Sequence, residues 1–166
     1  MKQIHSGALF DPALMQDIRK KLLSRNETIS VAESVTTGLL QTAIGSAPDA
    51  SQFFQGGITV YNIGQKHRHL RVEPIHAIRY NCVSKQVAEE MAHHVCDLFS
   101  SQWGLGVTGY ASPVPESGNL VFSHFAISYD HKIKTSRKIR GVGNDPFAVQ
   151  LHYVHEIMVA LRNVLR

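Results

Sequence analysis

The sequence predicts an α/β fold, namely a single-domain α/β/α sandwich with a mixed sheet over residues 1–166. Helix-like and strand-like segments alternate through most of the chain, which is typical of a sheet with helices on both faces. Two strand-like segments lie close together at 120–129 and 132–140, and they indicate a hairpin. The length of 166 residues suits one domain with a full hydrophobic core.

Capping residues and apolar spacing predict the helices. Helices are expected over 12–23, 36–44 and 84–99, over a segment that contains Lys66, and from 146 to the end of the chain. Asp11 before Pro12 is typical of an N-cap with proline in the first turn, and Ser84 caps the helix at 84–99. Strands are expected over 28–33, 54–62 and 105–109, in addition to the hairpin. Residues 111–119 form a loop, because they are rich in proline, serine and glycine.

Charge and composition exclude several classes of protein. The formal net charge is +4 with the ten histidines neutral, which slightly favours anionic ligands such as phosphate-bearing small molecules or nucleic acid. Residues 131–140 carry much of this charge, in the alternating pattern of a strand with one solvated face. There is no nucleic-acid-binding motif, no run of about 18 apolar residues and no signal peptide. Cys82 and Cys96 are expected to be reduced thiols. We therefore expect a cytoplasmic protein with neither nucleic acid nor membrane as a partner.

A serine, Ser34, lies at the junction between the strand at 28–33 and the next helix. It can be the N-cap of that helix, an interaction worth about 1 kcal/mol. It can also be a nucleophile, because N–H groups at a helix N-terminus can hold an oxyanion beside it. The small residues Thr36, Thr37 and Gly38 would let a substrate approach closely. These residues alone leave both interpretations open.

A nucleophilic serine needs a base, and Lys66 is the candidate. A lysine buried in an apolar pocket can lose its proton near neutral pH. Tyr61, five residues earlier, can relay a proton or donate a hydrogen bond to an anion. The ordinary alternatives are a solvated lysine and a half-buried strand tyrosine.

Histidines raise the question of a metal site. His67, His69 and His76 lie close in sequence, but residues two apart on a helix diverge. His93 and His94 are adjacent and are expected not to share a face. His152 and His155 can share a face, although a surface or interface role is the simpler interpretation. The sequence therefore predicts no metal.

Three segments occur in a characteristic order: VAESVTTGLL at 31–40, FQGGITVYN at 54–62 with Lys66 beyond it, and VSKQVAEEMA at 83–92. They are similar to A-E-S-C-T-G-G-L, F-x-G-G-x-x-x-Y-x-x-x-x-K and V-S-x-E-V-A-x-E-M-A. VTGYASP at 107–113 is a weaker match to V-T-G-I-A-G-P. Together these motifs resemble the C-terminal domain of the CinA competence/damage-inducible proteins, the nicotinamide-nucleotide amidase family.

The resemblance implies an amidase that converts nicotinamide mononucleotide to nicotinic acid mononucleotide and ammonia. It implies that Ser34, Tyr61 and Lys66 form the catalytic set. It also implies a small-molecule nucleotide as partner, no metal or organic cofactor, and a homo-oligomer. The residues expected to bind substrate are Thr36, Thr37, Gly38, Gly56, Gly57, Thr108, Gly109 and Ser112.

The sequence departs from the family pattern at three places. Thr37 stands where the family has glycine, and the loop at 112–118 replaces a G-P-G-G loop and adds Glu116. The segment 141–146 lacks the arginine that the family carries there. A carboxylate repels phosphate, so these departures bear on substrate binding above all. The alternative function is a non-catalytic or substrate-altered paralogue that serves as a nucleotide-binding or assembly module.

Overall fold

The structure, a computed structural model, describes residues 9–165 and is built on one five-stranded mixed sheet. The strands are β1 (Ile29–Glu33), β2 (Phe54–Thr59), β3 (Trp103–Gly109), β4 (Phe122–Tyr129) and β5 (Lys132–Arg140). Their order across the sheet is β2-β1-β3-β4-β5. β1 pairs in parallel with β2 and β3, whereas β4 runs antiparallel to β3 and β5 antiparallel to β4. The predicted fold class is therefore confirmed.

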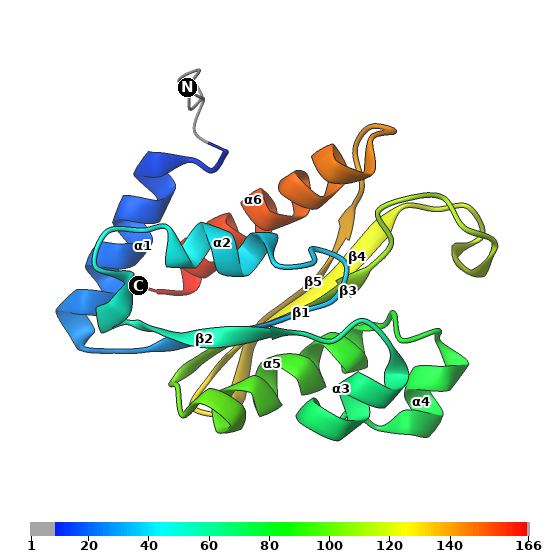
Figure 1. Cartoon of the computed structure of the whole chain (residues 1–166), viewed down its shortest axis with the longest axis horizontal. Coiled ribbons are helices and arrows are strands. Elements are labelled where there is room, and N and C mark those ends of the chain that lie inside the picture. Colours follow the sequence, from blue (N-terminus) through cyan, green and yellow to red (C-terminus); the bar gives the residue numbers. More distant parts are fainter. Residues whose placement is uncertain (1–8, 166) are drawn as a thin grey trace, which may run out of the picture.

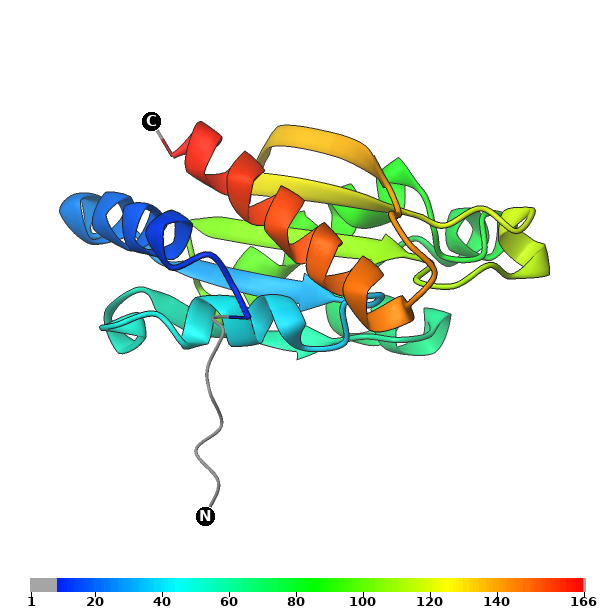
Figure 2. The same ribbon diagram turned by 90° about the horizontal axis from the view of Figure 1, so that it is seen from above.

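Helices cover both faces of this sheet, as the sandwich prediction requires (Figures 1 and 2). The helices are α1 (Pro12–Arg25), α2 (Leu39–Gly45), α3 (Ile63–Leu70), α4 (Pro74–Arg79), α5 (Lys85–Phe99) and α6 (Pro146–Val164). Figure 1 shows α1, α2 and α6 on one face and α3, α4 and α5 on the other. Short 3₁₀ turns lie at Ala50–Gln52 and Pro115–Ser117.

The predicted caps are confirmed at the starts of α1 and α5, and Asp145 caps α6 in the same way. The side chains of Asp11, Ser84 and Asp145 each accept hydrogen bonds from backbone N–H groups in the first turn of α1, α5 and α6. The prediction for α2 was wrong at its start, because that helix begins at Leu39 rather than at residue 36. The short helix α4 was not predicted, although Glu73 and Pro74 form the same cap-and-proline signal at its N-terminus.

Small residues let α5 pack closely across the middle of the sheet. A Cβ on Gly106 of β3 would lie only 2.3 Å from the carbonyl oxygen of Ala88, and one on Gly104 only 2.2 Å from that of Ala92. Side chains at these positions are excluded by the backbone of α5, so the glycines set the distance between helix and sheet. This close approach fixes the N-terminal end of α5 at the edge of the sheet where β3 ends.

The hairpin between β4 and β5 turns at the predicted residues. Asp130 and His131 both have positive φ, +46° and +61°, as the two central residues of a tight primed turn do. The turn lies at the edge of the sheet opposite Gly109, because β4 runs back along β3 and pairs its last residue, Tyr129, with Trp103.

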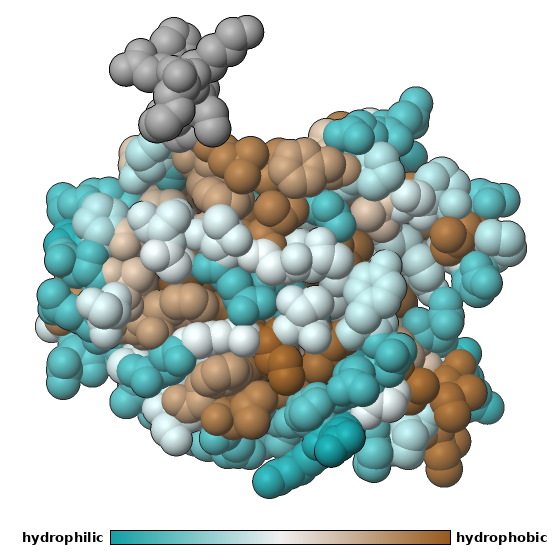
Figure 3. Space-filling view, viewed as in Figure 1, coloured by the Kyte–Doolittle hydropathy of each residue, from teal (hydrophilic) through white to brown (hydrophobic). Residues whose placement is uncertain are grey.

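The surface combines polar and apolar regions. Within the described chain, no helix is both long and apolar enough to cross a membrane. Apolar side chains gather over α4 at the lower right of Figure 3. Ile75 and Ile78 are the large apolar side chains of α4 that are exposed. Trp103, by contrast, belongs to the core, and its ring N–H donates to Glu27.

Candidate active site

A cleft of about 530 Å³ lies where β1, β2 and β3 end. Parallel strands present their carboxyl ends at one edge of a sheet, which is where ligands bind in open α/β folds. The lining residues are Ser34, Val35, Tyr61, Asn62, Ile63, Lys66, Asn81, Cys82, Val83, Thr108, Gly109, Tyr110, Ala111, Ser112, Val114, Pro146 and Gln150. The sheet thus brings together segments that are far apart in the sequence.

Ser34 and Lys66 are in direct contact at the bottom of this cleft. Lys66 Nζ lies 2.9 Å from Ser34 Oγ and 2.8 Å from the carbonyl oxygen of Val60. Lys66 reaches these atoms from α3, whose first turn is fixed by the Asn62 side chain accepting from the Gln65 N–H. Ser34 is 6% exposed and Lys66 only 1%. The hydroxyl and the amine are therefore held together inside the protein.

Burial lowers the pKa of Lys66 to about 8, and the neighbouring Cys82 raises it slightly. The cause is desolvation, which disfavours the charged ammonium. No carboxylate is hydrogen-bonded to Nζ among the described residues, so the charge has no strong partner to retain it. Above about pH 8 the amine carries a lone pair 2.9 Å from a hydroxyl, which is the geometry of a base beside its nucleophile.

Ser34 is not a helix cap, because Glu33 performs that function from the preceding position. The Glu33 side chain is fully buried and accepts hydrogen bonds from the N–H groups of Gly38, Leu40 and Gln41. It also accepts from the hydroxyl of Thr36. The carboxylate therefore satisfies the first turn of α2, where a negative charge is favourable. The Ser34 hydroxyl is left to face Lys66.

Residues 36–38 were expected to line the site, but their side chains are not among those that line the cleft. The Gly38 N–H is bonded to Glu33, and the Thr37 N–H is bonded to the carbonyl oxygen of Ser34. The N–H groups of Val35 and Thr36 form no hydrogen bond with any other described residue. These two groups directly follow the nucleophile candidate. They are therefore the donors best placed to hold an oxyanion.

Thr37 occupies a strained backbone conformation, with φ of +48°. A β-branched residue is rarely found there, because its side chain crowds the backbone. Gln150 of α6 braces this turn, donating from Nε2 to the carbonyl oxygen of Val35 at 2.7 Å. The strain is thus held in place by a helix that is distant in the sequence.

Tyr61 lies at the mouth of the cleft rather than between the serine and the lysine. It lines the cleft but is 72% exposed, and Lys66 reaches Ser34 without it. Its ring and hydroxyl are therefore available to a bound molecule. Asn81 also lines the cleft, and its side-chain amide donates to the hydroxyl of Tyr110. Asn81 lies outside the sequence motifs, whereas Tyr110 lies within VTGYASP but was not among the expected substrate-binding residues.

The remaining expected substrate-binding residues fall into two groups. Thr108, Gly109 and Ser112 line the cleft, and the Thr108 hydroxyl donates to the carbonyl oxygen of Cys82. Gly56 and Gly57 do not line it. A Cβ on Gly56 would lie 2.9 Å from the Phe99 ring, and one on Gly57 would lie 2.5 Å from the Gln41 side chain. These two glycines are thus explained by packing.

The histidines close to Lys66 do not converge. His67 Nδ1 lies 3.1 Å from the carbonyl oxygen of Val72, and His69 Nε2 lies 3.0 Å from Gln65 Oε1. His76 Nε2 lies 2.8 Å from the hydroxyl of Ser84. Each ring is therefore engaged with a different partner.

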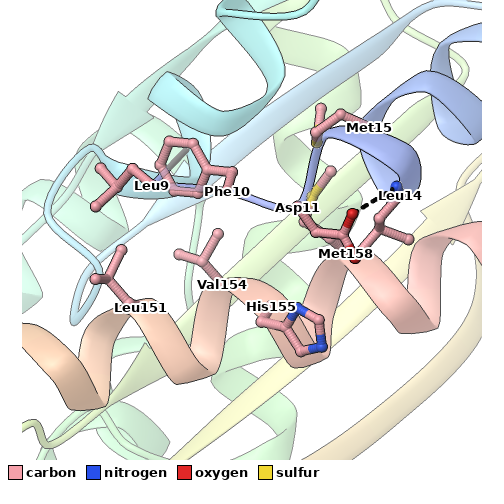
Figure 4. Close-up of a pocket in the computed structure, with 9 residues that line it drawn as sticks. All are labelled: Leu9, Phe10, Asp11, Leu14, Met15, Leu151, Val154, His155 and Met158. Atoms are coloured by element: carbon pink, nitrogen blue, oxygen red, sulfur yellow. Dashed lines mark hydrogen bonds between the residues drawn. The ribbon is translucent and has the colours of Figure 1, made fainter. Parts of the chain in front are cut away.

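A second hollow lies between α1 and α6 (Figure 4) and holds about 50 Å³. Its walls are mostly apolar, and Figure 4 shows Leu9 and Phe10 facing Leu151 and Val154 of α6. The Asp11 carboxylate at its rim is occupied as the cap of α1. The cleft at Ser34 therefore remains the candidate active site.

The fold and the site together define an α/β sandwich domain with a buried serine–lysine pair at the carboxyl ends of its parallel strands. Residues 11–165 match the family model of the CinA C-terminal domain, and the chain belongs to this family. A CinA-like protein of Prochlorococcus marinus is 33% identical over 150 residues, which are 88% of this chain and 35% of the relative. A putative competence-damage inducible protein of Alkaliphilus oremlandii is 38% identical over 103 residues, 62% of this chain and 25% of the relative.

The chain thus spans about a third or less of the curated relatives that it matches. Solved structures agree with the fold over nearly its whole length. The competence or damage-inducible protein from Enterobacter asburiae has a TM-score of 0.88 at 25% identity, covering 93% of this chain and 98% of that one. CihA from Agrobacterium tumefaciens has a TM-score of 0.88 at 22% identity, covering 96% and 99%.

The strain at Thr37 gives a test of the turn. We expect Thr37→Gly to stabilise the protein by about 1 kcal/mol, because glycine adopts positive φ without crowding. Denaturant unfolding measures the change. The matched variant Thr135→Gly, in the middle of β5, is expected to lose about 0.5–1 kcal/mol. Equal destabilisation by both variants would show that residue 37 is not strained.

Proposed function

We propose that this domain is a serine amidase that hydrolyses the carboxamide of nicotinamide mononucleotide, giving nicotinic acid mononucleotide and ammonia. The observation that carries the proposal is the 2.9 Å contact between Ser34 Oγ and a buried lysine whose pKa is lowered to about 8. Membership of the CinA C-terminal family supports it, together with the motifs around Ser34 and Lys66.

In the proposed first step, neutral Lys66 removes the proton of Ser34, and Ser34 Oγ attacks the carboxamide carbon. The N–H groups of Val35 and Thr36 stabilise the oxyanion that forms. Lys66 then returns the proton to the leaving nitrogen, and ammonia departs from the acyl-enzyme. In the second half, Lys66 removes a proton from water, the hydroxide attacks the ester carbon, and Lys66 returns the proton to Ser34 Oγ as the acid is released.

Other residues have supporting roles in the proposal. Tyr61, at the mouth of the cleft, offers its ring and hydroxyl to the pyridine carboxamide. Thr108, Gly109 and Ser112 contribute one wall of the cleft. Thr36 and Gly38 hold the turn behind the nucleophile through Glu33, and Thr37 holds it through its N–H bond to the carbonyl oxygen of Ser34. Self-association, which the family resemblance implies, stays part of the proposal and is not needed for any of these steps.

The proposed amidase is tested by ammonia release from nicotinamide mononucleotide in the presence of a chelator, with nicotinic acid mononucleotide measured by chromatography. We expect Ser34→Ala and Lys66→Met each to lower kcat by at least about 10³-fold, because each removes half of the nucleophile–base pair. Ser24→Ala on α1 and Lys85→Met on α5 are matched controls and are expected to keep full activity.

Two results would contradict the proposal. Turnover that survives in Ser34→Ala would exclude a serine nucleophile. Absence of turnover in folded wild-type protein that still binds the nucleotide would favour the nucleotide-binding module instead. The departures at Thr37 and in the loop 112–118 would then be the first positions to revert.

The charge of the cleft predicts how much the substrate phosphate contributes to kcat/KM. Lys66 is the only charged residue among the described residues that line the cleft, and it faces Ser34 at the bottom. The phosphate is left with neutral donors such as the hydroxyl of Ser112. We therefore expect kcat/KM for nicotinamide riboside to lie within about tenfold of that for the mononucleotide, since a charged partner is worth roughly 1.5–3 kcal/mol. A kcat/KM for the riboside more than a hundredfold below that for the mononucleotide would contradict the assignment of this cleft as the substrate site.

A further inference from the structure

A cluster of metal-binding side chains lies on α5, away from the cleft. One ligand atom from each of His93, His94 and Asp97 lies within 4.8 Å of the others. The expectation that adjacent histidines cannot share a face was wrong here. The rings of His93 and His94 stand nearly perpendicular, at 83°, with their centroids 4.7 Å apart. The side-chain rotamers therefore bring the two rings together, although the backbone positions point to different faces of the helix.

A third histidine joins the cluster from another element. His131, in the turn between β4 and β5, places Nδ1 3.6 Å from Asp97 Oδ1. Its ring centroid lies 5.0 Å from that of His93. His93 Nδ1 lies 3.0 Å from the backbone carbonyl oxygen of His131. The cluster therefore connects a helix to a hairpin that follows it by more than thirty residues in the chain.

The spacing of the donor atoms suits a small divalent ion. His94 Nδ1 lies 3.5 Å from Asp97 Oδ2. Two donors at about 2.1 Å from a tetrahedral ion are roughly 3.4 Å apart, so this pair needs almost no movement. When His93 donates from Nδ1 to the carbonyl oxygen, Nε2 keeps the lone pair that a metal requires. A backbone carbonyl that orients a histidine in this way is usual at metal sites.

One atom of the cluster is unsatisfied. His94 Nδ1 is shielded from solvent and makes no hydrogen bond within the part of the chain that the structure describes. Its contact with Asp97 at 3.5 Å is too long for one. A buried polar atom without a partner is unfavourable, and a bound cation would satisfy it.

Arg71 is the competing cation. Its guanidinium lies 3.7 Å from Asp97 Oδ2, but its side chain is 74% exposed and can turn into solvent. An exposed ion pair of this kind contributes little, so a metal can displace it. Asp97 itself is 40% exposed, which leaves a route for an ion to enter.

We propose that His93, His94, Asp97 and His131 bind one divalent transition metal ion of the zinc class. Imidazole nitrogens with one carboxylate are ligands that Zn²⁺ prefers. The ion would join α5 to the β4–β5 turn at the edge of the sheet opposite the Ser34 cleft. Its role is to stabilise the fold, since a ligand that binds only the folded state raises its stability.

The direct test is calorimetric titration of the full chain, stripped of metal with EDTA, against ZnCl₂. We expect one ion per chain, with micromolar or tighter affinity, and a rise of several degrees in the unfolding temperature that EDTA reverses. His94→Gln and Asp97→Asn should each weaken the affinity at least tenfold, and His131→Gln should do so by a comparable factor. His155→Gln on α6 is the matched control and should bind as the wild type does.

Absence of a Zn²⁺ isotherm below millimolar concentration would overturn the proposal. So would binding that persists in the double variant His94→Gln, Asp97→Asn. Co²⁺ provides a second readout that does not depend on stability, because a tetrahedral site with nitrogen and oxygen ligands gives intense visible absorption. Loss of that spectrum in Asp97→Asn, with unchanged circular dichroism, is expected. An unchanged spectrum would place the ion elsewhere.

Discussion

The buried amine of Lys66 is the constraint on which the candidate site depends. Desolvation lowers its pKa from 10.5 to about 8, so burial disfavours the charged form by roughly 3 kcal/mol. Because the pKa is lower in the folded protein, folding carries this penalty in full below about pH 8. The penalty disappears as the pH rises toward the unfolded pKa. A fold that tolerates this cost keeps an amine ready to act as a base near neutral pH.

The surroundings of Lys66 are arranged so that Ser34 faces it. Glu33 satisfies the N-terminus of α2, which releases the serine from the capping role that its position suggests. Gln150 of α6 holds the turn through the carbonyl oxygen of Val35, and Val60 provides a second acceptor for Nζ. The close packing of α5 on β3 fixes the opposite wall. The pair is therefore positioned by elements from both faces of the sheet.

Local signals in the sequence were sufficient for most of the fold. Asp11 and Ser84 marked two helix starts, and the alternation in 132–140 marked the edge strand. Parallel strands end at one edge of a sheet, which is why Ser34 and the segment after Gly109 line the same cleft.

Features that depend on tertiary contacts were missed. The carboxylate of Glu33 caps α2 although it lies five residues before the Gly38 N-cap, outside the spacing of any local capping motif. The packing roles of Gly56 and Gly57 appear only once Phe99 and Gln41 are placed beside them. Likewise, the convergence of His93 and His94 depends on ring rotation and on His131 arriving from a distant turn. The hydrophobic periodicity of a sequence indicates which face of a helix or strand is buried, but it contains no information on contacts between distant side chains.

The titration of Lys66 tests the central claim most directly. In protein labelled with ¹³C at the lysine ε-carbon, one signal should titrate near pH 8, and it should be the signal absent from Lys66→Met. This measurement needs no substrate and so does not depend on the identity of the amide. A Lys66 signal that titrates near 10.4, as solvated lysines do, would contradict the account, because almost none of the amine would then be neutral near pH 7 to 8 and able to act as the base for Ser34.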